Sequence, residues 1–301
     1  MRITRKKCLL FSSFLLSASL FAGCLGQTDK QSVEKIEGLD KLGTIKVITR
    51  EAGSGTRSVF VEKTNLESSD KNSDSDNIRT DAEIAMNAEA VMERVKEDEN
   101  AIGYISIGAA TEDMEQIKII GVDGVTPEKS NISKESYPLV RNINIAYSGK
   151  LGNAENDFLN YILSAGQEIV GEKYTSVKKV TSFLSDRSKG KITISGSSSA
   201  TPLLEELAEA YNQKYNKNVK IQVQTSDSTS GLTSAMQDSC DWGVASRELK
   251  DYEKELLTYQ TIAKDGVAVI VNEKNPTESL TIQQLTEIFD GTDTTWEEVN
   301  E

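Results

Sequence analysis

Hydrophobic positions follow two spacings along the chain, and these spacings predict its helices and strands. Apolar residues three or four apart, such as Leu203, Leu204, Leu207 and Tyr211, are typical of a helix with one buried face. Short runs of β-branched residues predict strands. In the run 266–271 nearly every position is apolar, which indicates a strand covered on both faces.

The two patterns alternate, which favours an α/β fold with sheets flanked by helices. The predicted helices are 57–63, 83–98, 155–172, 203–215, 232–238, 251–257 and 282–289. The predicted strands are 45–49, 102–107, 117–120, 142–147, 191–195, 220–225 and 266–271. The polar run 67–77 is predicted to be a surface loop.

Composition narrows the chemistry that this chain can perform. With 34 Lys and Arg against 47 Asp and Glu, the net charge of −13 makes it a poor candidate for binding nucleic acid. The chain has no histidine, which excludes Ser-His-Asp catalysis, histidine general bases and histidine metal ligands. Its cysteines, Cys8, Cys24 and Cys240, form no metal-binding or disulfide pattern.

Residues 1–23 predict an export signal. Basic MRITRKK precedes apolar CLLFSSFLLSASLF, which is too short for a comfortable membrane span. The following LFAGC resembles a bacterial lipobox, in which Cys24 would be lipidated, although Phe21 stands where Leu is usual. The alternative is a plain secretory signal cleaved near Gly23. We expect a protein anchored by lipid on the extracytoplasmic face of the cell membrane, with 24–41 as a polar tether.

Three strand-to-helix junctions share one chemistry: REAGSGT at 50–56, SGSSSATP at 195–202 and TSDSTSG at 225–231. Each places small hydroxyl residues and glycine where the first N–H groups of a helix are unpaired and its dipole is positive. Such junctions bind anions, phosphate above all. One alone would be an ordinary helix cap. Three together, one of them with the guanidinium of Arg50, favour an oxyanion site.

Asp241 is predicted to place a carboxylate in the same site. Phosphate near neutral pH still carries a proton and can donate a hydrogen bond, whereas sulfate cannot. A buried carboxylate would therefore accept from phosphate and repel sulfate. The alternative is an ordinary surface aspartate. GSGT is not a nucleophile elbow and no P-loop is present, so we expect neither an enzyme nor a nucleotide hydrolase.

A set of motifs then carries a family resemblance. It comprises REAGSGTR, NAIGYISIG, YPLVRNINIAY, SGSSSATPLLEELAEAY, DWGVASRELKDYEKE, DGVAVIVNEKNP and LTIQQLTEIFDG with TTWEEV. Together these resemble the phosphate-binding lipoprotein of bacterial phosphate ABC transporters. The resemblance implies a two-lobed periplasmic-binding-protein fold of type II, the Venus-flytrap kind, which closes over one dehydrated phosphate. It further implies delivery to the transporter permease, with no cofactor and no metal.

Matching the family's ligands position by position implies a set of phosphate-binding residues. TSDSTSG stands where a glycine-rich loop is common, and the choice between the side chains of Ser198 and Ser199 stays open. The implied residues are Arg50, Ser54, Gly55, Thr56, Ser198, Ser199, Ser228 and Asp241.

The motifs occur in an unusual order. The family usually begins with the serine-rich loop and reaches the arginine loop after TTWEEV, whereas here the two halves are swapped. We interpret this as a circular permutation joined through 176–190; the alternative is a fragment of a tandem protein. The predicted lobes are 42–136 plus 276–301, with Arg50, and 137–275, with the serine loops and Asp241. The hinge is expected near 137–138 and 275–276.

Other functions remain open at this point. A signalling or scaffold lipoprotein of the same fold would explain the altered second serine loop. A binder of another tetrahedral oxyanion, such as molybdate or tungstate, would use the same junctions, although Asp241 argues against unprotonated ligands. An acid phosphatase is disfavoured because neither histidine nor a nucleophile with a base is present.

Overall fold

The computed structural model describes residues 36–68, 75–108, 110 and 114–300. The predicted export signal, Cys24 and most of the polar run at 67–77 lie outside these ranges. Residues 35–301 belong to one compact unit. Within the described ranges, no helix combines the length and apolarity that a membrane crossing requires.

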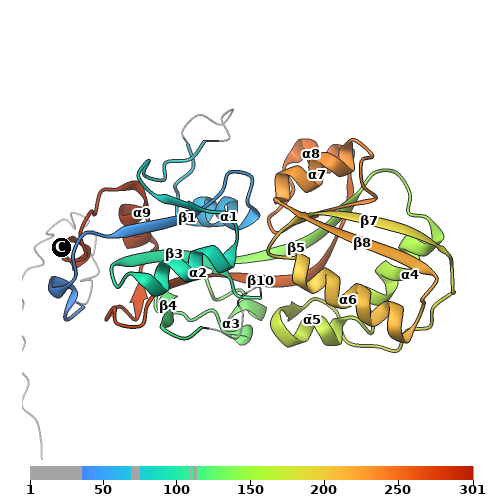
Figure 1. Ribbon diagram of the computed structural model, residues 1–301, viewed down its shortest axis with the longest axis horizontal. Helices are drawn as coiled ribbons and strands as arrows, with labels where there is room; N and C mark the ends of the chain where they lie inside the picture. Colours follow the sequence, from blue (N-terminus) through green and yellow to red (C-terminus); the bar gives the residue numbers. More distant parts are fainter. Residues whose placement is uncertain (1–35, 69–74, 109, 111–113, 301) are drawn as a thin grey trace, which may run out of the picture. The chain divides into compact units, whose positions relative to one another are not determined.

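Two groups of strands build the two lobes, and both groups share one long strand, β10 (Figure 1). The hydrogen-bonded order is β2-β1-β3-β10-β5-β9-β7-β8, while β4, β6 and β11 pair outside this path. The strands are β1 (Lys46–Arg50), β2 (Glu83–Ala85), β3 (Ala101–Ser106), β4 (Ile117–Val122), β5 (Val140–Tyr147), β6 (Thr175–Ser176), β7 (Gly190–Ser197), β8 (Val219–Ser226), β9 (Trp242–Ala245), β10 (Thr258–Asn272) and β11 (Ser279–Leu280).

Helices cover these strands, and their bounds follow the predicted apolar stripes closely at α6, α8 and α9, whereas α7 begins four residues before its predicted start. The helices are α1 (Gly55–Lys63), α2 (Ala88–Glu97), α3 (Lys129–Ser133), α4 (Asn153–Ile162), α5 (Gln167–Lys173), α6 (Thr201–Lys214), α7 (Ser228–Met236), α8 (Asp251–Leu256) and α9 (Ile282–Asp290). Short 3-10 helices, η1 (Leu39–Lys41) and η2 (Glu298–Asn300), lie near the two ends.

Two predicted helices are interrupted. The segment predicted as one helix from 83 starts with β2, which pairs with β1, and α2 begins only at Ala88, where Asn87 accepts a hydrogen bond from Ala90 N (2.9 Å). The segment 155–172 divides into α4 and α5. The side chain of Gln167 donates to the carbonyls of Ile162 and Ile262 at 3.0 Å, which anchors the break to β10. Tertiary pairing therefore overrides helix periodicity at both places.

β10 carries the chain from one lobe to the other. Its first part, 258–266, pairs with β5, and its second part, from Val267 onward, pairs with β3 and β4. The prediction that this second part is covered on both faces is confirmed, because every residue from Gly266 to Val271 is buried. However, its partners belong to the lobe of Arg50. The crossing therefore lies near Gly266, and the predicted boundary at 275–276 is displaced by several residues.

Each lobe has its own aromatic core. In the lobe of Arg50, Phe60 stacks on Tyr104 with ring centroids 4.1 Å apart and contacts Phe289 at 4.5 Å. In the other lobe, Phe158 stacks on Trp242 at 5.5 Å. Such pairs contribute stabilising energy beyond their buried area.

The first and last described residues lie side by side (Figure 1). Ile36 N donates to the side chain of Asn300 (2.8 Å), and Ile45 N donates to the carbonyl of Thr294 (2.8 Å). Leu39 is fully buried in the core of the Arg50 lobe. Residues 36–41, which the sequence assigned to the tether at 24–41, are therefore part of the packed fold and not of a free tether.

The segment predicted to join the two swapped halves is held by one carboxylate. Asp157 on α4 accepts hydrogen bonds from Ser185 Oγ (2.6 Å), Asp186 N (2.9 Å) and Tyr211 Oη (2.6 Å). Burial alone would raise the pKa of Asp157, but these hydrogen bonds outweigh it and hold the pKa below its usual range.

We predict that Asp157→Asn lowers the free energy of unfolding by about 1–3 kcal/mol, because buried donors lose their acceptor. Urea unfolding at pH 7 measures this, with the exposed Glu172→Gln on α5 as a control that should change nothing. Because the folded pKa is depressed, the carboxylate stabilises the fold above its unfolded pKa of about 4, and this contribution is lost as pH falls through the folded pKa. A difference in the free energy of unfolding between wild type and variant that persists at low pH would contradict this role.

Candidate functional site

Three strand-to-helix junctions meet where the two lobes face each other. β1 ends at Arg50, and α1 begins at Gly55 with Ser54 as its N-cap. β7 and β8 run into α6 and α7 in the same way, and because these strands are parallel neighbours, their two junctions lie side by side. The N-termini of three helices therefore converge on one place.

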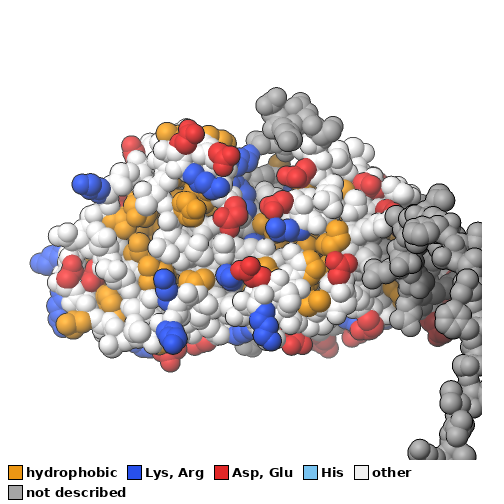
Figure 2. Space-filling model, turned by 180° about the vertical axis from the view of Figure 1, so that it is seen from behind, with side chains coloured by type: hydrophobic (Ala, Val, Ile, Leu, Met, Phe, Trp, Pro, Cys, Tyr) orange, Lys and Arg blue, Asp and Glu red, His pale blue; other side chains and the backbone are white. Residues whose placement is uncertain are grey.

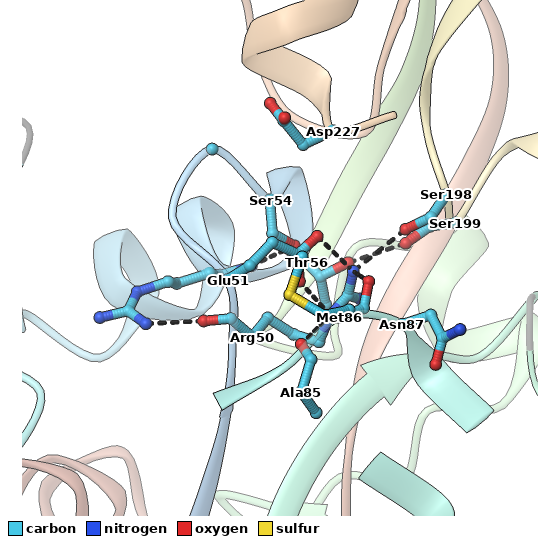
Figure 3. A network of polar contacts seen from close by, with 12 residues as sticks. Arg50, Glu51, Ser54, Thr56, Ala85, Met86, Asn87, Ser198, Ser199 and Asp227 are labelled. Carbon is cyan, nitrogen blue, oxygen red and sulfur yellow. Dashed lines mark hydrogen bonds and ion pairs between the residues drawn. The ribbon is translucent and has the colours of Figure 1, made fainter. Parts of the chain in front are cut away.

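Hydrogen bonds cross from the arginine loop to the first serine loop (Figure 3). Arg50 Nη2 donates to Ser198 Oγ at 3.0 Å. The hydroxyls of Thr56 and Ser199 lie 2.8 Å apart. Arg50 and Ser198 are 148 residues apart in the sequence, and the fold brings their side chains into contact.

Arg50 is buried and almost fully engaged. Its side chain is 1% exposed, and its Nε and Nη2 each donate to the carboxylate of Glu51 at 2.8 Å. The same nitrogens also donate to the carbonyls of Ala85 (3.2 Å) and Met86 (3.3 Å). Its Nη1 has no partner among the described residues. A buried guanidinium nitrogen left unpaired is costly, so this donor is available for an anion.

Both serines of the first serine loop reach the site. Ser198 contacts Arg50, and Ser199 contacts Thr56. The backbone carbonyl of Ser199 also accepts from Tyr174 Oη at 2.6 Å. Burial raises the pKa of Tyr174, so this hydroxyl stays protonated and donates. The sequence left open whether Ser198 or Ser199 uses its side chain in the site. In the structure the hydroxyls of both residues face the arginine loop.

Ser228 and Ser246 approach the arginine loop from the other lobe. Ser246 N donates to Ser228 Oγ at 3.1 Å. A Cβ atom on Gly55 would lie 2.4 Å from Ser228 Oγ and 2.5 Å from Ser246 Oγ. Glycine is thus required at position 55 because the facing hydroxyls occupy the space of any larger side chain.

A buried ion pair supports the site from the strands that join the lobes. Arg141 on β5 donates to Asp265 Oδ2 on β10 through Nε (2.9 Å) and Nη2 (2.7 Å), and the two side chains are 1% and 0% exposed. Arg141 Nη1 donates to Thr56 Oγ1 of one lobe (2.7 Å) and to Ser246 Oγ of the other (3.2 Å). One guanidinium therefore contacts hydroxyls of both lobes.

Sequence reasoning missed Arg141, Asp265 and Ser246. A signal for the first two was present, because a charged residue inside an apolar strand is rarely buried unless it is paired. Ser246 follows β9 directly, and ligands of α/β sheets lie at the carboxyl ends of strands.

Asp241 is not part of the site, and its predicted role is wrong for this arrangement. The residue is exposed and accepts from Thr193 N and Thr193 Oγ1, both at 2.6 Å. It precedes β9, whereas Ser246 follows it, so at about 3.3 Å per residue the two ends are roughly 16 Å apart. The strand direction places the serine, and not the aspartate, next to the arginine loop.

Local groups, and not the overall charge, must attract an anion here. On the face shown in Figure 2, acidic and basic side chains are interspersed and form no single basic patch. A cavity of about 300 Å³ borders Arg141, and its lining carries three carboxylates, from Glu62, Glu135 and Glu248, against the two cations Lys63 and Arg141. No cluster of metal-binding side chains occurs among the described residues.

Comparisons with known proteins agree with this arrangement. The model of a PBP superfamily domain matches residues 25–165 and 181–301. A phosphate-binding protein PstS 2 of Streptococcus agalactiae is 38% identical over 297 residues, which is 97% of each chain. The crystal structure of the phosphate-binding protein of a Streptococcus pneumoniae phosphate ABC transporter superimposes with a TM-score of 0.72 and 37% identity, over 85% of this chain and 100% of that chain.

A third relative matches over a shorter stretch. The phosphate-binding protein PstS of Staphylococcus saprophyticus is 36% identical over 124 residues, which is 38% of this chain and 39% of that protein. The level of identity is similar to that of the streptococcal relative, but the collinear match covers less than half of either chain.

We predict that Gly55→Ala weakens phosphate binding at least tenfold, because the new methyl group would meet the hydroxyls of Ser228 and Ser246 and hold the lobes apart. Calorimetric titration with phosphate measures the change. Gly43→Ala is the matched control, since a Cβ there would meet only Asn100 at an ordinary 3.7 Å. Equal phosphate affinities of the two variants would contradict the close approach of Gly55 to Ser228 and Ser246.

Proposed function

Because the chain belongs to the phosphate-binding proteins of bacterial phosphate ABC transporters, we propose that it captures inorganic phosphate outside the membrane and delivers it to a transporter permease. The proposal includes binding without catalysis, since its relatives are named as binding proteins and the chain has no histidine base. The motif LFAGC supports attachment of the protein to the membrane through a lipid on Cys24.

One observation of the site carries the proposal. Buried Arg50 has an unpaired Nη1, its Nη2 donates to Ser198 Oγ, and the hydroxyls of Thr56 and Ser199 are in contact at the start of α1. A dehydrated phosphate needs donors for each of its oxygens, and guanidinium, hydroxyl and helix N–H groups supply them in a site that excludes water. The same geometry supports Ser54, Gly55 and Ser228 as the neighbouring contacts.

Two other functions make different predictions. A signalling or scaffold lipoprotein would bind no phosphate in calorimetry. Another oxyanion binder would prefer molybdate or tungstate, and Asp241 no longer argues against these ligands because it lies away from the site. Titration with phosphate, molybdate and tungstate in turn separates the three functions.

We further propose that the two halves are circularly permuted relative to other members of the family. Two observations support this. The first and last described residues, Ile36 and Asn300, lie side by side, which agrees with a permutation. A swapped order also limits a collinear match to about half of a conventionally ordered relative, which agrees with the staphylococcal alignment, whereas the streptococcal relatives align from end to end.

We predict that Arg50→Ala weakens phosphate binding by about 2–5 kcal/mol, because a desolvated charge partner of the anion is removed. This corresponds to roughly 30-fold to several thousandfold in dissociation constant. The exposed Arg187→Ala is the matched control and should bind like wild type. If both variants bind equally, Arg50 does not hold the anion.

We predict that the protein is a monomer in solution with a radius of gyration of about 18 Å for the unit formed by residues 35–301. Small-angle scattering coupled to size-exclusion chromatography measures this. The fragment alternative requires each half to pair with another molecule, so an obligate dimer would favour it over a permuted monomer.

A further inference from the structure

One end of the lobe that carries the serine loops is rich in cations. Residues 177–191 and 214–220, here called the basic end, contain eight Lys and Arg and one acidic residue, Asp186, in a chain whose net charge is −13. All eight basic side chains are exposed. None of them forms an ion pair within the part of the chain that the structure describes, so their charges face solvent uncompensated.

Strand pairing brings the two stretches of the basic end together. β7 and β8 are parallel neighbours, and Lys191 lies opposite Lys220 in their register, so both side chains stand on the same face of the sheet. Asn216 Nδ2 also donates to the carbonyl of Ser188 at 2.9 Å. The serine loops follow the other ends of these strands, which at about 3.3 Å per residue is roughly 25 Å away. The basic end is therefore separate from the candidate phosphate site.

An exposed leucine lies among the cations of 177–191, and the loop that presents it is held on both sides. Leu184 is 92% exposed, and Val180 is 54% exposed. Phe183 turns inward and packs edge-on against two tyrosine rings of the core, with ring centroids 5.6 and 5.3 Å away. Ser185 Oγ donates to the carboxylate of Asp157 on α4. Because both neighbours of Leu184 are anchored to the lobe, the fold itself directs this side chain outward.

The combination of charge and apolar surface fits an anionic lipid surface better than a protein partner. A single exposed apolar residue is ordinary and indicates nothing by itself. Val180 and Leu184 are the exposed large hydrophobic side chains of the basic end, which is far less surface than the roughly 800 Å² that each partner buries in a stable protein interface. Apolar side chains among cations do match the boundary between acyl chains and anionic headgroups.

The position of the basic end adds to this argument. The contact of Ile36 with Asn300 lies in the Arg50 lobe, whereas β7 and β8 start at the opposite end of the unit formed by residues 35–301 (Figure 1). The predicted N-terminal anchor therefore reaches the membrane from one end of this unit. A second contact at the other end would lay the line that joins the two lobes along the membrane surface.

We propose that the basic end docks on an anionic lipid surface, with Val180 and Leu184 inserted between the headgroups and the surrounding cations paired with lipid phosphates. This role goes beyond phosphate capture, because it uses residues of a different part of the lobe. It depends neither on the bound anion nor on lipidation of Cys24. Each Lys or Arg held near an anionic surface adds to the attraction, so the contact weakens with salt and with every charge removed.

A tryptophan introduced by Leu184→Trp reports this contact, because the native Trp242 and Trp296 are both 0% exposed and stay away from lipid. The full-length protein is titrated with vesicles of brominated phosphatidylcholine, alone or mixed with phosphatidylglycerol. The N-terminal segment is the same in every sample, so differences in quenching report the basic end. Mixed vesicles should quench the new fluorescence, whereas neutral vesicles should not, and about 1 M salt should abolish the effect because it screens charges beyond about 3 Å.

Leu256→Trp on α8 is the matched probe. Leu256 is 62% exposed but lies outside the basic end, so its substitute should stay unquenched by the same mixed vesicles. Equal quenching of the two probes would show that lipid contacts the lobe without using the basic end.

Charge reversal tests the cations in the Leu184→Trp background. Three reversals in the basic end should raise the lipid concentration for half-maximal quenching at least about tenfold, because each removes an attraction and adds a repulsion. The variant combines Lys178→Glu, Lys179→Glu and Lys189→Glu. The matched control has the same net charge and should shift this concentration less than about twofold. It reverses three exposed lysines of the Arg50 lobe: Lys41, Lys134 and Lys274.

Any of three further results would overturn the docking surface. These are no quenching by mixed vesicles, equal quenching by neutral vesicles, and an equal loss in the two triple variants when both melt cooperatively. Calorimetry with phosphate keeps the two proposals apart, since both triple variants should bind phosphate like wild type. Absence of phosphate binding would overturn the proposed function and leave the quenching result as the measure of membrane docking.

Discussion

The buried pair between Arg141 and Asp265 is the interaction on which the binding site depends. Two charges taken out of water are costly, and their attraction compensates only when geometry and further hydrogen bonds are good. Here the strands β5 and β10 place them antiparallel and adjacent, with Asp265 pairing opposite Arg141 in the register. The free nitrogen of this guanidinium then contacts Thr56 and Ser246, so the joining strands, and not the lobes alone, define how the lobes meet.

The site gathers donors without gathering net charge. The positive charge of Arg50 is paired with the carboxylate of Glu51, and that of Arg141 with the carboxylate of Asp265. The chain as a whole has a net charge of −13. In the proposed site, the groups that attract the anion are helix N-termini, hydroxyls and one unpaired guanidinium nitrogen. Fixed dipoles of this kind act strongly where water is excluded, because the low local dielectric strengthens each hydrogen bond. An acidic surface is therefore compatible with an anion site, and the interspersed charges on the molecule need not contribute to it.

Much of the fold follows from local patterns, but particular elements show where these patterns end. The stripe of Leu203, Leu204, Leu207 and Tyr211 predicted α6 within two residues at its start and one at its end. The same method extended α2 backward over β2, because a three-residue edge strand has no periodicity of its own. Asp241 was misplaced for a similar reason. Its type suited the chemistry, but which end of β9 faces the arginine loop depends on the direction of that strand in the sheet.

The sequence by itself determined most of the elements and the three hydroxyl-rich junctions, since each depends on neighbouring residues, and its motif order is the basis of the proposed permutation. Only the tertiary structure decided which residues meet. The length of β10, the crossing near Gly266, the contact between Ile36 and Asn300 and the reach of Arg141 into both lobes all depend on pairings between residues far apart in the chain. Local sequence cannot specify such pairings, because they depend on how whole sheets pack, and it is these pairings that place Ser246 and exclude Asp241.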